Sequence, residues 1–289
     1  MLTSSRSSTF VVLNIRNTYA GAMSDGTWSE AGLANRFTDE AYASVKGYVR
    51  THVMHQQLLQ HLPQPPAAVL DVGGGAGHQC FPLAEAGFDV TLLDSSPAML
   101  DKARQRLARL PADVQRRVTL VQADGENADE AVRGRRFAAV LCHGVLGYQE
   151  RPEPLLDQLC RCAAEGGIVS IMSGNAKTMA VRPALEQRWE DALAAFDTRT
   201  ETVPGLGVRG RADTVEELGE LLRERGVEPL RWYGAWLFVD WLEFSGVELD
   251  PSDTERAATI AAVELEASQR DPYRQLSRAF HLVARKPSS

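Results

Sequence analysis

The sequence predicts an α/β fold with a doubly wound, Rossmann-like sheet, and three observations support this. Apolar runs typical of strands alternate with helical segments from Ala67 onward, as a parallel sheet requires. Four glycines fall within positions 73–77, directly after an apolar run that contains Asp71. A second apolar run ends at another acid, Asp94. In such sheets ligands bind beyond the carboxyl ends of the strands, so the glycines and the acid are expected at the same edge.

The first half of the chain is predicted to supply four strands. A helix over 39–61 is closed by three prolines between positions 63 and 66. Each strand is a short run rich in apolar and β-branched residues, and helical segments separate the first three strands. After the opening helix the predicted order is strand 67–72, helix 78–86, strand 88–93, helix 97–110, strand 118–123 and strand 137–142.

The alternation breaks after the fifth strand. A helix over 152–164 and a turn at Gly166-Gly167 lead into this strand, predicted at 168–172. Residues 177–196 are predicted as a helix interrupted by Pro183, and residues 197–213 as a loop. This helical insertion, at about 176–213, is where a substrate lid is expected.

The core is predicted to resume at Thr214, which caps a helix over 214–225 with Glu217 three residues on, and Gly226 ends it. A strand over 228–238 and a helix near 251–268 follow, and the last strand, 279–285, is expected to be antiparallel in an otherwise mostly parallel sheet. Residues 39–289 thus form one domain. Residues 1–38, of which about the first 25 are serine-rich, are predicted to be a flexible extension, with a targeting peptide as the alternative.

The glycine spacing separates two kinds of nucleotide site. A dinucleotide site needs Gly-x-Gly-x-x-Gly, but the third glycine position is His78 when counted from Gly73 and Cys80 when counted from Gly75. The spacing Asp-x-Gly-x-Gly-x-Gly instead fits sites for S-adenosylmethionine (SAM). Glycine adopts positive φ freely and lets main chain approach a ligand closely. A turn without a ligand is the alternative, and four glycines make it hard to sustain.

Asp94 is the candidate for binding the ribose of the cofactor. It lies seventeen residues after Gly77, near the offset of about 20 residues expected in a βαβ unit. An acid at this strand end can accept hydrogen bonds from both ribose hydroxyls. The alternative role is the N-cap of the helix that begins near Pro97.

Composition restricts the remaining classes of function. The chain has 289 residues, 44% hydrophobic content and a net charge of −7, which argues against a strongly basic nucleic-acid surface without excluding a local patch. No apolar run approaches the roughly 18 residues of a membrane span, so no membrane partner is expected. The cysteines lack metal-ligand spacing, so we expect no metal, free thiols and a cytoplasmic location. They are Cys80, Cys142, Cys160 and Cys162.

Segments outside the glycine loop carry a family resemblance. They are the run 42–50 (YASVKGYVR), His143 after the fourth strand, the run 174–176 (GNA), the run 271–273 (DPY) and the run 281–287 (HLVARKP). On these segments the chain resembles class I SAM-dependent methyltransferases, and among them the tRNA carboxymethoxyuridine methyltransferase family. That family methylates the carboxyl group of a modified wobble uridine. The resemblance implies the same fold, a SAM cofactor and a tRNA partner.

The resemblance also implies a set of cofactor contacts. It places Arg50 at the methionyl carboxylate, as a forked ion pair, and Gly125 and Glu126 at the adenine, with Asp124 as the alternative acid. His143 is implied beside the donor methyl. Together with the glycine motif, the candidate cofactor residues are Arg50, Asp71, Gly73, Gly74, Gly75, Asp94, Asp124, Gly125, Glu126 and His143.

The candidate catalytic residues are His143 and Lys46, with Tyr42 and Asn175 as further groups that could hold an acceptor anion. A carboxylate acceptor is ionised at neutral pH and needs no general base. If the acceptor were a hydroxyl, His143 would be the base.

Two rival functions remain open. The insertion mixes acids with arginines, whereas phosphate contacts dominate RNA affinity, so a small-molecule O- or N-methyltransferase is the first alternative. A SAM-binding protein without catalysis is the second. A nicotinamide-dependent oxidoreductase is disfavoured by the glycine spacing.

Overall fold

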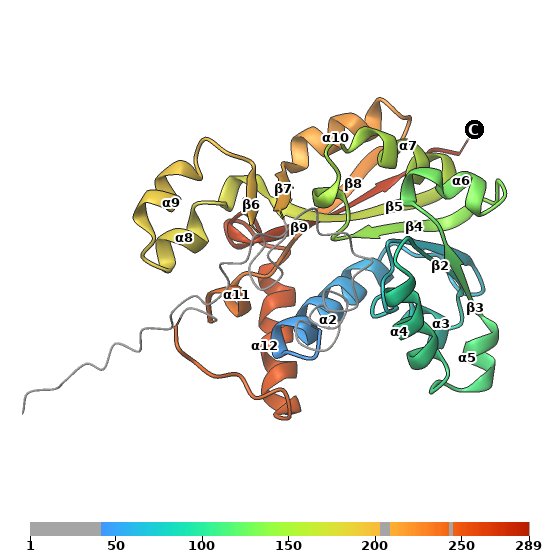
Figure 1. Ribbon diagram of the computed structural model, residues 1–289, viewed down its shortest axis with the longest axis horizontal. Coiled ribbons are helices and arrows are strands. Elements are labelled where there is room, and N and C mark those ends of the chain that lie inside the picture. The colour runs from blue at the N-terminus through green and yellow to red at the C-terminus, as the bar shows by residue number, and fades with distance from the viewer. Residues whose placement is uncertain (1–41, 203–208, 243–244, 289) are drawn as a thin grey trace, which may run out of the picture.

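The computed structural model describes residues 42–202, 209–242 and 245–288. The extension predicted at 1–38 lies outside the described residues. A central twisted sheet carries helices on both faces (Figure 1). Within the described residues no helix is long and apolar enough to span a membrane.

Five parallel strands form the main part of the sheet, in the order β3-β2-β1-β4-β5. Their bounds are β1 Ala68–Val72, β2 Asp89–Asp94, β3 Val118–Gln122, β4 Phe137–His143 and β5 Ala163–Asn175. β9 (Ala279–Arg285) pairs antiparallel with β5, and β8 (Glu228–Ala235) pairs antiparallel with β9. The predicted sheet, mostly parallel with an antiparallel last strand, is therefore confirmed.

Two apolar clusters attach helices to the two faces of the sheet (Figure 1). On one face lie α2 Val45–Leu59, α3 Phe81–Glu85, α4 Pro97–Leu107 and α5 Ala112–Arg116. On the other lie α6 Ala128–Ala131, α7 Glu153–Cys162 and α10 Val215–Arg223. α12 (Thr254–Ala267) packs against α2 through a third cluster. All four cysteines are buried and free, as predicted.

The insertion after β5 differs from its prediction. The helix expected over 177–196, with one interruption at Pro183, is three short pieces, η4 Ala176–Thr178, α8 Val181–Leu185 and α9 Trp189–Ala194. Pro183 does not cause the break, because it lies in the first turn of α8, where its missing N–H costs nothing. The chain turns instead at Gln187, whose φ is 59°.

The prediction of a loop over 197–213 is also wrong. It contains a hairpin of β6 (Thr200–Thr202) and β7 (Arg209–Asp213), and β7 extends the sheet by pairing in parallel with the end of β5. Both strands are short and polar, so the local pattern gave no strand signal, and pairing with a preformed edge stabilises them.

Two boundary predictions also change, and one holds. Gly166 and Gly167 lie inside β5, where the register against β4 shifts, and a Cβ on Gly167 would lie 2.9 Å from two carbonyl oxygens. β8 ends at Ala235 because Trp236 adopts a φ of 59°. The cap at Thr214 is as predicted, since its hydroxyl accepts the Glu217 amide at 3.2 Å.

Candidate functional site

The glycine turn after β1 is shaped by steric limits on both sides. Gly73 has a φ of 71°, and a Cβ there would lie 2.3 Å from Cγ2 of Val145, which follows β4. Gly77 has a φ of 79°, and its Cβ would lie 2.4 Å from the Phe81 ring. The Gly73 amide donates to the carbonyl of Leu93 at 2.7 Å. The turn therefore presses main chain against the ends of β2 and β4, as a cofactor cradle requires.

Asp94, at the end of β2, is fixed by two backbone amides. Its Oδ2 accepts from Gly75 and its Oδ1 from Ser96, both at 2.8 Å. Burial raises the pKa of Asp94, and the two amides oppose this shift. The alternative role as helix cap is wrong, because Ser96 is the N-cap of α4 and its hydroxyl accepts the Met99 amide. Each Asp94 oxygen keeps a lone pair that a ribose hydroxyl could use.

Asp71 lies beneath the glycine turn. It is 2% exposed, and a Cβ on Gly74 would lie 2.8 Å from its Oδ2. That oxygen has no hydrogen-bond partner among the described residues. Burial raises the pKa of Asp71 to about 7, while the Cys80 thiol and the Arg50 charge act in the opposite direction. The acid supports the turn from inside and does not line it.

Arg50 reaches the site from α2. Its guanidinium donates to the Tyr42 hydroxyl at 2.6 Å and to the carbonyl of His143 at 3.4 Å. It also lies over the rings of Tyr42 and Trp236. The side chain is almost fully buried, so these contacts hold a cation beside the end of β4. That position suits a ligand carboxylate.

His143 ends β4 and is 8% exposed. Its Nε2 lies 2.8 Å from the Ser170 hydroxyl, while its Nδ1 has no hydrogen-bond partner among the described residues. Burial, His281 and Arg50 together hold the pKa of His143 well below its usual value. The imidazole is therefore neutral at physiological pH.

The loop after β3 contains the predicted adenine contacts. Asp124 caps the short helix η2 (Gly125–Asn127), and its Oδ1 accepts the Glu126 amide at 2.9 Å. Both acids are exposed. A Cβ on Gly125 would lie 2.8 Å from Cδ1 of Leu155, so a larger residue there would have to displace that side chain. Asp124 therefore has a structural role as a helix cap, and the Glu126 side chain does not share that role.

Lys46 and Asn175 are already engaged by protein groups. Lys46 forms an ion pair with the buried carboxylate of Asp240, which also lies 3.6 Å from Arg182 of the insertion. The Asn175 amide donates to the carbonyls of Gln275 and Ser277 and accepts from the Lys177 amide. Lys46 connects α2 to the insertion, and its catalytic role stays a prediction.

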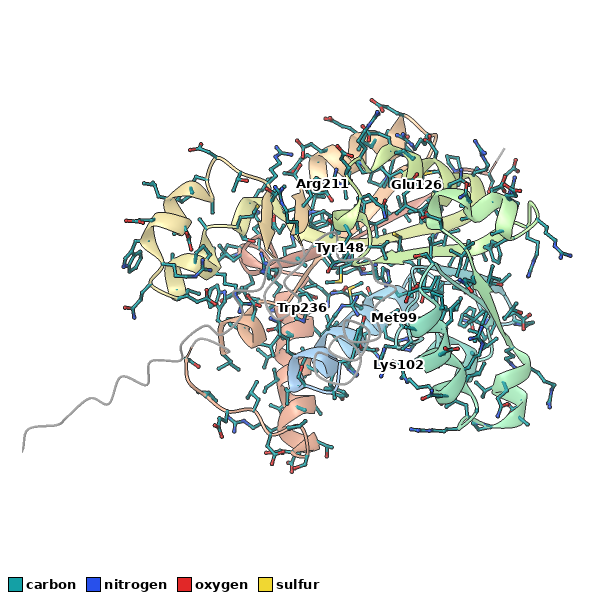
Figure 2. All side chains as sticks on the ribbon, in the orientation of Figure 1. Met99, Lys102, Glu126, Tyr148, Arg211 and Trp236 are labelled. Carbon is teal, nitrogen blue, oxygen red and sulfur yellow. The ribbon has the colours of Figure 1, made fainter. Side chains whose placement is uncertain are left out.

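The predicted cofactor residues gather at one edge of the sheet, beyond the ends of β1 to β4, with Arg50 added from α2. In the view of Figure 2, Met99, Tyr148 and Trp236 are labelled near the middle of the molecule, where α2 and the ends of these strands come together. Among the described residues, no group of three or more His, Cys, Asp or Glu side chains could hold a metal ion.

Sequence reasoning gave no role to three buried polar residues next to this edge. They are Gln57 on α2, Ser170 on β5 and His281 on β9, and each is 0% exposed. The available signal was a polar residue inside an apolar strand, at Ser170 in IVSIM and at His281 in AFHLV.

Comparison with known proteins identifies the family. Residues 70–169 match the model of a methyltransferase domain. A trans-aconitate 2-methyltransferase from Paracidovorax citrulli is 30% identical over 257 residues, which cover 82% of this chain and 87% of that protein. The chain belongs to the class I SAM-dependent methyltransferases. A tRNA 5-carboxymethoxyuridine methyltransferase from Escherichia coli is 26% identical over 262 residues, covering 89% of this chain and 95% of that protein.

Solved methyltransferase structures share the fold. The magnesium protoporphyrin IX methyltransferase of Synechocystis PCC 6803, solved with bound S-adenosyl-L-homocysteine, has a TM-score of 0.58 at 16% identity, covering 89% of this chain and 95% of that one. A glycopeptide N-methyltransferase solved with SAM has a TM-score of 0.53, also at 16% identity, with 83% and 96% covered. The enzyme is thus a SAM-dependent methyltransferase, and the residues present fit the cofactor. The main-chain cradle at Gly73 leaves no room for a Cβ, and the buried Nδ1 of His143 has no hydrogen-bond partner among the described residues.

Proposed function

We propose that this methyltransferase esterifies a carboxylate, and that the carboxylate belongs to a modified wobble uridine of tRNA. The chemical class of acceptor is supported by three relatives whose names specify the acceptor. They act on 5-carboxymethoxyuridine in tRNA, on trans-aconitate and on a malonyl group carried by a protein. Each of these acceptors carries a free carboxylate. The similarity to the tRNA enzyme over 95% of its length is the observation that carries the choice of tRNA.

The proposed roles of the cofactor residues are supported by the geometry above and, for the adenine contacts, by the family resemblance. Arg50 binds the methionyl carboxylate, and Asp94 accepts hydrogen bonds from the ribose hydroxyls. Gly73, Gly74 and Gly75 supply main chain against the cofactor, and Asp71 supports that turn. Glu126 and the Gly125 amide hold the adenine. SAM supplies an activated methyl on a sulfonium, so the protein mainly has to align the acceptor and exclude water.

A carboxylate acceptor agrees with the electrostatics at His143. The carboxylate is ionised at neutral pH and needs no proton removed. His143 is neutral and buried beside Arg50, and burial disfavours a charged imidazole there. We therefore propose that the ring positions a ligand and carries no charge during the reaction.

The insertion is proposed to face the acceptor and to favour tRNA over a small acid. It exposes Trp189 by 65% and Phe196 by 77%, which is unusual for aromatic side chains. RNA readers stack splayed bases on such rings. A Trp189→Ala variant should lose methylation of tRNA and retain SAM binding.

The buried free thiols agree with a reducing compartment, and we propose that the reaction takes place in the cytoplasm.

The test is methylation of bulk tRNA that has first been treated with mild alkali to expose its ester-linked carboxylates. Protein and methyl-labelled SAM are incubated with this tRNA or with a panel of small carboxylic acids, and the tRNA is then digested to nucleosides. We expect label in a uridine derivative, released as methanol by alkali. Label only in small acids would replace the tRNA proposal by its first alternative, a small-molecule methyltransferase. Bound SAM without any turnover would favour the non-catalytic alternative.

A further inference from the structure

A chain of buried hydrogen bonds runs from α2 to the end of β4. Gln57 Oε1 lies 2.8 Å from His281 Nδ1, and His281 Nε2 lies 2.7 Å from the Ser170 hydroxyl. The same hydroxyl lies 2.8 Å from Nε2 of His143. We call these four residues the relay. Their side chains come from four different elements, α2, β9, β5 and β4, and meet in the interior.

The direction of every bond in the relay is fixed from its Gln57 end. The Gln57 amide nitrogen donates to the carbonyl of Gly234 at 3.2 Å, so the amide oxygen faces His281. Nδ1 of His281 must therefore carry the proton. Burial, with His61 and Arg50, lowers the pKa of His281 to about 3, so this ring is neutral and its Nε2 is an acceptor.

Ser170 transmits this choice to His143. A serine hydroxyl has a single proton, and Ser170 donates it to Nε2 of His281. Toward His143 the hydroxyl oxygen can then only accept. Nε2 of His143 must carry the proton of its neutral ring, and Nδ1 carries a lone pair. This is the nitrogen that has no partner among the described residues.

We propose that Gln57, His281 and Ser170 are positioning residues that hold His143 in the Nε2–H tautomer, so that its Nδ1 is a fixed acceptor for the α-ammonium of the cofactor. The inference rests on the proposed cofactor site and deepens it. The Arg50 guanidinium donates to the carbonyl of His143, so a cation and a neutral acceptor stand side by side. The methionyl end of the cofactor carries a carboxylate and an ammonium on one carbon. Arg50 and His143 can bind the two groups together.

Two alternatives to this arrangement, a carboxylate acceptor at Nδ1 and a protonated imidazole, are less suitable. A carboxylate acceptor has no proton to donate and would be repelled by the lone pair. A protonated imidazole would itself repel the ammonium. Burial excludes this charged ring, because it holds the pKa of His143 well below its usual value, and the relay then fixes which nitrogen of the neutral ring carries the lone pair.

The tautomer can be measured directly. Nitrogen NMR of ¹⁵N-histidine-labelled protein distinguishes Nε2–H from Nδ1–H rings, and a His143→Gln variant assigns the signals. We expect a pure Nε2–H pattern for His143 in the wild type and a mixed pattern in Ser170→Ala and Gln57→Met. Gln57→Met acts at the far end of the relay without touching His143. A pure Nδ1–H ring in the wild type, or an unaltered pattern in both variants, would overturn the proposal.

Ligand binding supplies an independent readout. Calorimetry should show that Ser170→Ala weakens S-adenosylhomocysteine about 10-fold or more, the range for one hydrogen bond to a charged group. 5′-Methylthioadenosine lacks the amino-acid end, so its affinity should not change. Ser170→Thr keeps the hydroxyl and should restore the binding. Ser173→Ala is the matched control, since it removes a buried hydroxyl of the same strand that bonds Asp213 and lies outside the relay.

The outcomes separate this inference from the proposed function. No binding of S-adenosylhomocysteine by the folded wild type would refute the cofactor site itself. Equal weakening of both ligands in Ser170→Ala would show a purely structural role for the relay and overturn the inference alone. Loss of turnover in Ser170→Ala with unchanged cofactor affinity would also overturn it, because the lone pair would then serve the acceptor.

Discussion

The buried carboxyl of Asp71 makes stability depend on pH in a way that an Asp71→Asn variant can measure. Its pKa is about 7 in the folded protein against 3.8 in the unfolded chain. Between about pH 4 and pH 7 the folded protein therefore holds a proton that the unfolded chain has released. The free energy of unfolding falls across this window as pH rises, because unfolding there releases a proton and a higher pH favours that release. The shift corresponds to about 4 kcal/mol in total.

Asparagine keeps the shape of Asp71 and cannot ionise, so the variant should gain stability relative to the wild type as pH rises. The same two pKa values give a relative gain of about 2.5 kcal/mol between pH 5 and pH 8. Urea unfolding at several pH values measures it, since any pH-independent cost of the amide cancels in the comparison. Asp89→Asn, at the exposed first position of β2, is the control and should show no such trend. A constant difference between Asp71→Asn and the wild type would refute the reasoning.

Three further predictions concern the turn, the ribose site and a helix cap. Asp94→Asn should lose charge-assisted bonds to the ribose, about 1.5–3 kcal/mol each, and calorimetry with S-adenosylhomocysteine would contradict this by showing an unchanged Kd. Gly73→Ala adds a clash with Val145 to the strain of a positive φ and should destabilise by about 2–4 kcal/mol in urea unfolding. Gly134→Ala is the control, because Gly134 also has a positive φ, 70°, but has open space around it, so this variant should show the strain alone. Equal losses of unfolding free energy in the two variants would disprove the clash. Thr214→Ala should cost about 1 kcal/mol of unfolding free energy through its lost cap, and an unchanged urea midpoint would reject that role.

The sheet and its ligand edge could be predicted because their signals are local. A buried parallel strand reads as an apolar run, and an acid or glycine at its end is visible without knowing the partner strands. Asp94 and the glycine turn were found in this way. The hairpin β6–β7 could not be found, because its strands form only against the end of β5, and that pairing joins residues nearly forty positions apart.

The relay could not be predicted from the sequence for a related reason. Ser170 and His281 could be seen as polar residues inside apolar strands, which usually indicates a satisfied core group and nothing more. Their meaning depends on register, because β5 and β9 must align so that one hydroxyl meets two imidazoles. A shift of one residue would turn either side chain to the opposite face of the sheet.

The arrangement divides recognition of the cofactor between two parts of the fold. The glycine turn and Asp94 belong to the sheet edge and are proposed to contact the adenosine, which many nucleotides share. Lys46, Arg50 and Gln57 are spaced by four and seven residues and so lie along one face of α2. Arg50 and the relay are the groups of this face that we propose for the amino-acid end, and through Lys46 and Asp240 the same face contacts the insertion. Selection of a cofactor with a methionyl end therefore depends on a helix that precedes the sheet, and a swap of the glycine turn alone would not change it.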